Sequence, residues 1–97
     1  MNIADDGGRA TVLAEILKAI ANPTRLRLVA ALCEGPSVVG ALAERLGVPP
    51  AIVSQELRIL RMGGLVGAER SGGFANYSLA EAGLKDLIKC LEKCPRA

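Results

Sequence analysis

Apolar residues recur every three or four positions along most of this chain, and the breaks between these runs divide it into short helices. The first such run covers residues 11–20. The second follows Asn22-Pro23 and continues to about Cys33. Asn22 is a favourable N-cap, and Pro23 suits a first helical turn because the amide it lacks would have no partner there. The period of the apolar positions therefore predicts two helices before the middle of the chain.

A helix–turn–helix is predicted over residues 38–62, after a break at Glu34-Gly35-Pro36. Ser37 is expected to cap its first helix. Gly47 ends that helix, because a residue without Cβ readily adopts the left-handed conformation found at helix C-termini. Pro49-Pro50 then opens the second helix. Its polar faces carry Ser, Gln and Arg side chains, which is typical of a helix that reads the major groove.

Two short strand-like runs around a Gly-Gly turn predict a β-hairpin over residues 65–79. The last apolar period predicts a helix over residues 81–94, and residues 1–9 are expected to be a disordered tail. The order helix, helix, helix, helix, hairpin, helix is that of a winged helix–turn–helix. We therefore predict one domain over residues 1–97, mainly α with a β-hairpin wing.

The composition adds a prediction about assembly. Hydrophobic residues make up 51% of the chain but aromatic residues only 2%, so the core must be aliphatic. A chain of 97 residues has a large surface for its volume and cannot easily bury so much apolar material alone. We therefore expect a homodimer formed through the terminal helices. The net charge of +2 neither favours nor excludes nucleic acid.

Several classes of protein are disfavoured by what the chain lacks. No apolar run approaches the roughly 20 residues of a membrane span, and the acidic, polar beginning differs from a secretory signal, so a cytoplasmic protein without a membrane partner is expected. The chain contains no histidine, which excludes histidine-based zinc sites and histidine-dependent triads. It also has no glycine-rich phosphate loop and no nucleophile–base pair, so we expect no enzymatic activity.

Three segments resemble the ArsR/SmtB (arsenic-repressor) family of bacterial transcriptional regulators, in the family's order and spacing. The resemblance covers roughly residues 11–91 and implies a homodimer that binds operator DNA, represses transcription and releases DNA when an inducer binds. The segments are ANPTRLRLVAAL at 21–32, ALAERLGVPPAIVSQELRILRMGGLV at 41–66 and RSGGFANYSL at 70–79.

The chain departs from this family at the known metal sites. The resemblance would place cysteines at Val38 and Gly40, and His and Asp near Glu81 and Gly83. The cysteines are absent at Val38 and Gly40, and Glu81 and Gly83 cannot form the second site. Any inducer must therefore bind elsewhere.

The second helix of the helix–turn–helix carries four candidate DNA contacts. Gln55 can pair with adenine through two hydrogen bonds, and Ser54 can bond a base edge or a phosphate. Arg58 and Arg61 are candidates for phosphates or for acidic neighbours. Glu56 is unfavourable close to phosphates, and we expect a neighbouring arginine to hold it back.

The wing offers two further candidates, Arg70 near its start and Asn76 near its end, for the minor groove or the backbone. With one basic residue, the wing predicts few phosphate contacts and a shallow salt dependence. These features leave an alternative open, in which the winged helix binds another protein and has lost DNA binding.

Three cysteines are the candidate sensing residues. Cys90 and Cys94 are four positions apart, which predicts one face of the last helix, and Cys33 ends the second helix. Thiolates bind soft metals and metalloids, so arsenite or another thiophilic ion is one candidate inducer. Oxidation or persulfidation of the same thiols is an alternative. Cys33 is equally compatible with a plain core position, since free cysteine is often buried.

Overall fold

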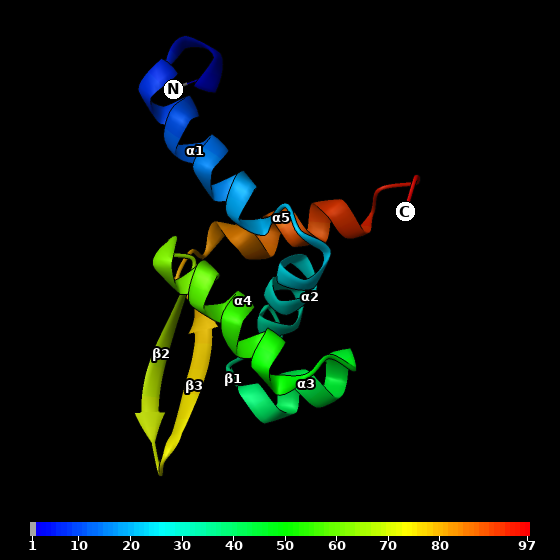
Figure 1. Ribbon diagram of the computed structural model, residues 1–97. Coiled ribbons are helices and arrows are strands. Elements are labelled where there is room, and N and C mark those ends of the chain that lie inside the picture. Colours follow the sequence, from blue (N-terminus) through cyan, green and yellow to red (C-terminus); the bar gives the residue numbers. More distant parts are fainter. Residues whose placement is uncertain (1) are drawn as a thin grey trace.

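The computed structural model describes residues 2–97, which form five α-helices, one short 3-10 helix and a three-stranded sheet (Figure 1). In chain order the elements are η1 (Ile3–Asp5), α1 (Gly7–Ile20), α2 (Pro23–Leu32), β1 (Ser37–Val38), α3 (Val39–Leu46), α4 (Pro50–Met62), β2 (Val66–Ser71), β3 (Phe74–Leu79) and α5 (Gly83–Glu92). The predicted order of four helices, a hairpin and a final helix is therefore present. The small strand β1 was not predicted.

The sequence signals for helix ends have the expected geometry. The Asn22 side chain accepts hydrogen bonds from the backbone N–H groups of Thr24 and Arg25, at 3.0 and 3.1 Å. At the end of α3, Gly47 has a φ of 66°, the left-handed conformation that glycine adopts without strain. The next amide, Val48 N, donates to Ala43 O at 3.1 Å and satisfies one of the last carbonyls of α3.

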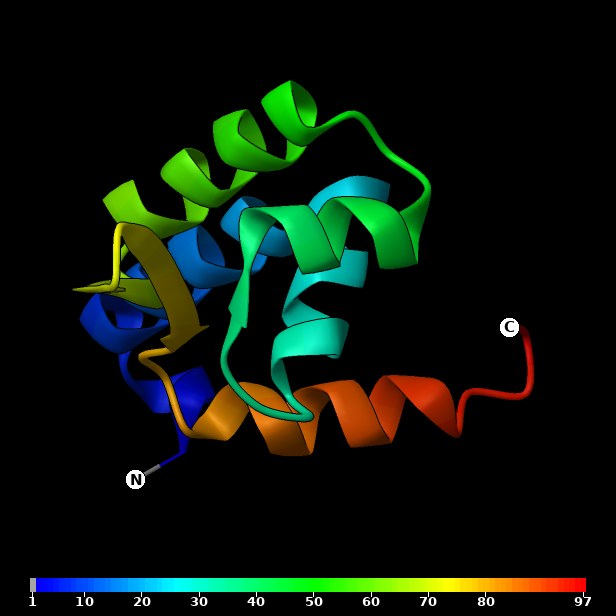
Figure 2. The ribbon, with the colours of Figure 1, turned by 90° about the horizontal axis from the view of Figure 1, so that it is seen from below.

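The core is aliphatic and is organised around α2. Figure 2 shows α2 between α5 on one side and the α3–α4 pair on the other. Leu28, Val29 and Leu32 of α2 are buried there. They pack in one cluster with buried residues of the other elements, namely Leu42, Leu46, Val53, Leu57, Leu60, Leu65, Leu84 and Ile88.

The sheet has the strand order β1-β3-β2, and both pairings are antiparallel. A two-residue turn at Gly72-Gly73, with φ values of 59° and 85°, joins β2 to β3. Ser37 pairs with Tyr77 and Val38 with Asn76. The prediction that Ser37 caps α3 is therefore wrong: the N-cap is Val38, and no side chain caps this helix.

The start of the chain is more ordered than predicted. Asn2 accepts from Ala4 N at 2.9 Å and caps η1, while Asp6 accepts from Arg9 N at 2.9 Å and caps α1. The expected disordered tail over residues 1–9 is therefore wrong for residues 2–9. Residue 1 lies outside the described residues. Because Asp6 supplies the cap, α1 begins at Gly7 and not near Thr11.

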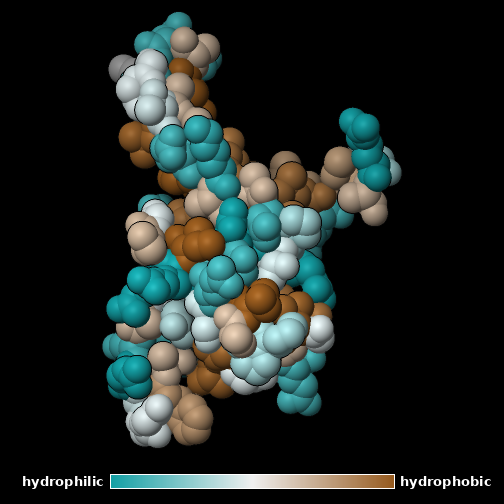
Figure 3. All heavy atoms as spheres, viewed as in Figure 1, coloured by the Kyte–Doolittle hydropathy of each residue, from teal (hydrophilic) through white to brown (hydrophobic). Residues whose placement is uncertain are grey.

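The helix α1 projects from the rest of the molecule (Figure 1). The whole molecule, with this helix, measures 46 × 30 × 20 Å. Apolar side chains of this arm stay in solvent: Val12 is 61% exposed and Leu17 51%. Figure 3 shows apolar atoms on the surface of the arm. An apolar groove lies between the start of the chain and α5, lined mainly by Ile3, Leu13, Ile16, Leu17, Leu84 and Leu87. Within residues 2–97, no helix is long and apolar enough to cross a membrane.

Candidate nucleic-acid interface

The helix α4 has one buried side and one exposed side, and the exposed side carries polar side chains together with Ile52, Ile59 and Met62. Its buried side chains Val53, Leu57 and Leu60 repeat at spacings of four and three residues and pack into the core. The predicted contact residues lie on the exposed remainder of the helix, and all four are exposed: Ser54, Gln55, Arg58 and Arg61. Helical periodicity alone thus places the predicted reading side chains in solvent.

Glu56 of α4 is paired with an arginine, as expected, and that arginine comes from α2. The Arg25 Nη1–Glu56 Oε2 distance is 2.9 Å, and the two side chains are only 17% and 16% exposed. The same guanidinium donates from Nε to Ala19 O at 2.6 Å. The one carboxylate on the reading helix is therefore neutralised by a partner 31 residues away in the chain.

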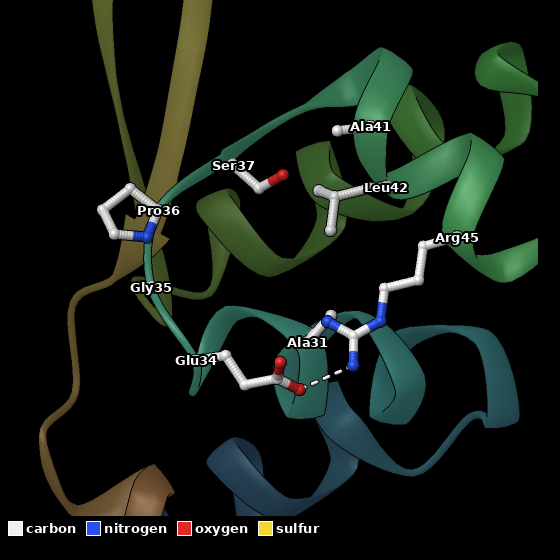
Figure 4. Close-up of a pocket in the computed structure, with 8 residues that line it drawn as sticks. All are labelled: Ala31, Glu34, Gly35, Pro36, Ser37, Ala41, Leu42 and Arg45. Carbon is white, nitrogen blue, oxygen red and sulfur yellow. Dashed lines mark hydrogen bonds and ion pairs between the residues drawn. The ribbon is translucent and has the colours of Figure 1, made fainter.

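Two further arginines fix α3 against α2. Arg27 Nη2 donates to Leu46 O at 3.0 Å, which satisfies a carbonyl at the end of α3. Arg45 Nη2 bonds Glu34 Oε2 at 2.6 Å across a shallow pocket, where Figure 4 shows the two side chains pointing toward one another. This hydrogen bond holds the pKa of the Glu34 carboxyl below its usual range. These contacts join α3 to α2 and to the turn after it, and the Arg45–Glu34 pair, with both side chains more than half exposed, adds little to stability.

Arginines outside these contacts are available for a polyanion. Within residues 2–97, the ion pairs are Lys18–Glu15, Arg25–Glu56 and Arg45–Glu34, whereas Arg58, Arg61 and Arg70 form none. These three arginines thus lie on α4 and on the wing, and the paired ones lie between helices.

The two predicted wing residues point to opposite faces of the hairpin. Arg70 pairs with Ala75, while Asn76 pairs with Glu69. Cross-strand partners share a face and neighbours along a strand alternate, so Arg70 and Asn76 do not form one contact surface. Glu69 also offsets the charge of Arg70. The tip is apolar, because Phe74 directly follows the turn and is 67% exposed.

The three cysteines do not gather within one chain. Cys33 is half-buried, whereas Cys90 and Cys94 are exposed. Cys33 lines a shallow pocket with Lys85, Lys89 and Glu92 of α5, a set of α5 side chains that does not include Cys90. No group of three or more His, Cys, Asp or Glu side chains that could hold a metal ion occurs among residues 2–97.

The last helix is shorter than predicted, and it includes Cys90 but not Cys94. The helix α5 covers Gly83–Glu92, so the predicted range 81–94 is too long at both ends. Cys90 lies in its last turn. Cys94 lies beyond the C-cap Lys93, with its N–H donating to Leu91 O at 3.0 Å. The prediction that both thiols share one helical face is therefore wrong, because the helix ends before Cys94.

The surroundings of Cys33 lower the reactivity of its thiol. Burial against α5 raises the pKa of the Cys33 thiol above its usual value, although the nearby Lys85 acts in the opposite direction. At neutral pH this thiol is protonated, and the protonated form is a poor nucleophile and metal ligand.

Comparison with known proteins agrees with this geometry. Residues 22–67 match the family described as bacterial regulatory protein, arsR family. The biofilm growth-associated repressor of Xylella fastidiosa is 37% identical over 83 residues, which cover 86% of this chain and 73% of that protein. This chain belongs to the ArsR family of bacterial transcriptional regulators.

Solved structures of similar proteins extend the likeness to the whole fold. The ArsR-family chain is similar to the transcriptional repressor BigR from Xylella fastidiosa, with a TM-score of 0.87 and 35% identity, covering 97% of this chain and 98% of that one. It is also similar to the homodimeric winged helix–turn–helix DNA-binding domain Mb0332 from Mycobacterium bovis. That likeness has a TM-score of 0.78 and 30% identity, and covers 89% of this chain and 80% of the other. The predicted winged helix–turn–helix fold is thereby confirmed.

Two residues of this ArsR-family chain that lie near the candidate interface were not among the predicted site residues. Arg25 gives no signal in the sequence, because no local pattern links it to Glu56. Phe74 lies within a predicted strand of the hairpin. The composition did hold a signal for Phe74: it is the chain's single phenylalanine, and it lies beside the wing turn.

Proposed function

We propose that the chain is a cytoplasmic, dimeric transcriptional repressor that binds operator DNA through α4 and the wing. The observation that carries the proposal is the exposed polar face of α4, with Ser54, Gln55 and Arg58 outward and its carboxylate already paired with Arg25. Gln55 supplies the donor and acceptor that adenine pairs with, and Arg58 and Arg61 supply charge for phosphates.

DNA binding is tested with the segment upstream of the chain's own gene, because such regulators act on neighbouring DNA. Affinity is measured by fluorescence anisotropy at a series of salt concentrations. Arg58, Arg61 and Arg70, doubled in a homodimer, give a slope of log affinity against log salt of about −5 or shallower. A protein that shows no salt-dependent affinity for this segment or for a random DNA library contradicts the proposal.

That contradicting result would favour a different function, a winged-helix module that binds proteins. The feature in its favour is the wing, which carries no net charge over Glu69 and Arg70 and exposes Phe74 at its tip. Against it stands the pairing of Glu56 with Arg25, which removes the unpaired carboxylate that would have disfavoured DNA.

We further propose that the inducer acts on Cys90 and Cys94. Both thiols are exposed and lie within one turn of chain at the end of α5. A site that adds Cys33 in the same chain has no support, because these thiols form no such group among residues 2–97. Two exposed thiols can supply ligands to a soft metalloid such as arsenite, or can be oxidised or persulfidated.

Arsenite, cadmium and a persulfide donor are therefore titrated separately against the protein–DNA complex. We expect at least one of them to release the wild-type protein and not the Cys90→Ser/Cys94→Ser variant. The Cys33→Ser variant is the matched control and should still respond. Release that survives in the double variant contradicts the thiol pair as the inducer site.

A further inference from the structure

Arg25 of α2 bonds the two neighbouring helices α1 and α4, and so connects three helices. It lies in the first turn of α2, where its own N–H donates to the capping Asn22 side chain at 3.1 Å. Its guanidinium donates to Ala19 O near the end of α1 at 2.6 Å and to Glu56 Oε2 of α4 at 2.9 Å. The ion pair is largely sheltered from water, with both side chains below one-fifth exposed. The side chain thus has fixed partners on both neighbouring helices.

Arg25 contacts α1 at the C-terminal end of that helix. The last four carbonyls of a helix have no intrahelical partner and carry partial negative charge, so a cation near Ala19 is favourable. Arginine suits this double contact because its planar group offers donors in two directions at once, which an ammonium does not do with fixed geometry. The end of α1, the protruding helix, is thereby linked to α4.

The contact with α4 involves the residue next to the proposed base reader. Glu56 is one residue from Gln55 on the same helix, so an unpaired charge there would act on phosphates near α4, although its carboxylate turns toward Arg25 and is only 16% exposed. A carboxylate without a partner would repel phosphates and would have to be desolvated when the complex forms. With Arg25 in place, the pair is neutral before DNA arrives.

Building on the proposed function, we propose that Arg25 is a positioning residue for DNA binding. It keeps the Glu56 carboxylate from opposing the phosphates, and it ties the position of α4 to the end of α1. Arg25 acts through Glu56 and makes no contact with DNA itself.

The test is a double-mutant cycle on DNA that the wild-type protein binds. Affinities are measured for wild type, Arg25→Gln, Glu56→Gln and the double variant, with folding checked by circular dichroism. We expect Arg25→Gln to lose about tenfold, Glu56→Gln to bind at least as well as wild type, and the double variant to return to within about twofold of Glu56→Gln. The salt slope of Arg25→Gln should equal that of wild type, because no phosphate contact is lost.

Three results would overturn this role. Arg25→Gln could bind like wild type, could lose the same factor whether or not the Glu56→Gln change is also present, or could reduce the salt slope by about one, as a direct phosphate contact would. If Arg25→Gln does not fold, Arg25→Lys takes its place in the cycle and should lose affinity only when Glu56 is present. Wild-type protein that binds no DNA would instead refute the proposed function.

Discussion

At the scale of single residues, the arginines divide into two groups with different tasks. Arg25, Arg27 and Arg45 bond carbonyls or carboxylates between helices. Arg58 and Arg61 have no ion pair among residues 2–97 and stay in solvent on α4. Replacing a member of the first group should disturb the arrangement of helices, and replacing a member of the second should mainly change binding.

Arg58→Ala should weaken DNA binding by a similar factor for every sequence tested. Loss of one phosphate contact per chain should reduce the salt slope by about two for a dimer. The matched control is Arg96→Ala, which removes the same charge from the exposed residues after α5. Anisotropy titrations at several salt concentrations measure both. Equal slopes for Arg58→Ala and wild type would contradict a phosphate contact.

The environment of Cys33 predicts a pH dependence of stability. Its pKa is raised in the folded protein by burial, so above the ordinary thiol pKa the folded state holds this proton more firmly than the unfolded state. The stabilisation is complete below that ordinary pKa and is lost as pH rises through the raised one. The Cys90→Ser/Cys94→Ser variant is compared by urea unfolding with the same variant carrying Cys33→Ala. Between pH 7.5 and pH 10, the free energy of unfolding should fall further in the protein that keeps Cys33, because its unfolded state releases about one more proton than its folded state. Equal falls would contradict the sheltered thiol.

At the scale of elements, the turn between α3 and α4 depends on one backbone conformation. Gly47 has a φ of 66°, and a Cβ added there would meet no atom within 4 Å. Gly47→Ala should therefore destabilise the protein by about 1 kcal/mol through backbone strain alone. Gly40→Ala in α3 is the matched control: it also meets no atom, has no positive φ, and should be neutral or stabilising by up to about 0.5 kcal/mol. Denaturant unfolding measures both, and equal effects would contradict the strain.

The elements that could be predicted are those whose signals are local. Asn22 caps α2, Gly47 ends α3 and Pro50 begins α4, and each of these ends depends on residues within a few positions. The strand β1 was missed because two residues become a strand only by pairing with Tyr77 and Asn76, far along the chain. The helical start was missed because η1 has only three residues and because α1 begins at Gly7, four residues before the apolar period that starts at Thr11.

The same reasoning explains which parts of the candidate site could be predicted. The exposure of Ser54 and Gln55 follows from the helical period of α4. The partner of Glu56 is 31 residues away, so the sequence indicates that an arginine is needed but not which one. The opposite directions of Arg70 and Asn76 depend on the register of the hairpin, which the turn at Gly72-Gly73 sets. The position of Cys94 outside α5 was also not predicted, because the apolar period does not show at which residue a helix ends.

At the scale of the whole molecule, the exposed apolar side of α1 predicts the mode of assembly. Leu17 is 51% exposed and lines the groove between α1 and α5 together with Leu87. A second copy of the chain would cover this surface and remove it from water. Leu17→Glu should therefore shift the protein from dimer to monomer and weaken DNA binding about tenfold or more, because a dimer binds two half-sites at once.

The matched control for Leu17→Glu is Thr11→Glu, which adds the same charge to α1 away from the groove. Sedimentation velocity reports the oligomeric state and anisotropy reports DNA affinity. The prediction fails if Leu17→Glu stays dimeric, or if Thr11→Glu dissociates to the same extent.

The pairing of β1 with the wing has a consequence for the geometry of the operator. Val38 pairs with Asn76 and directly precedes α3, while Leu65 N donates to Leu60 O and joins α4 to the wing. In each chain, α3, α4 and the wing would therefore meet DNA as one rigid unit. In a twofold dimer, the distance between the two α4 helices can change, and it must match half-sites about 10 base pairs apart. Inserting or deleting one base pair between the half-sites should thus reduce affinity more than most single base changes within them. An inducer would act by changing the distance between the two α4 helices.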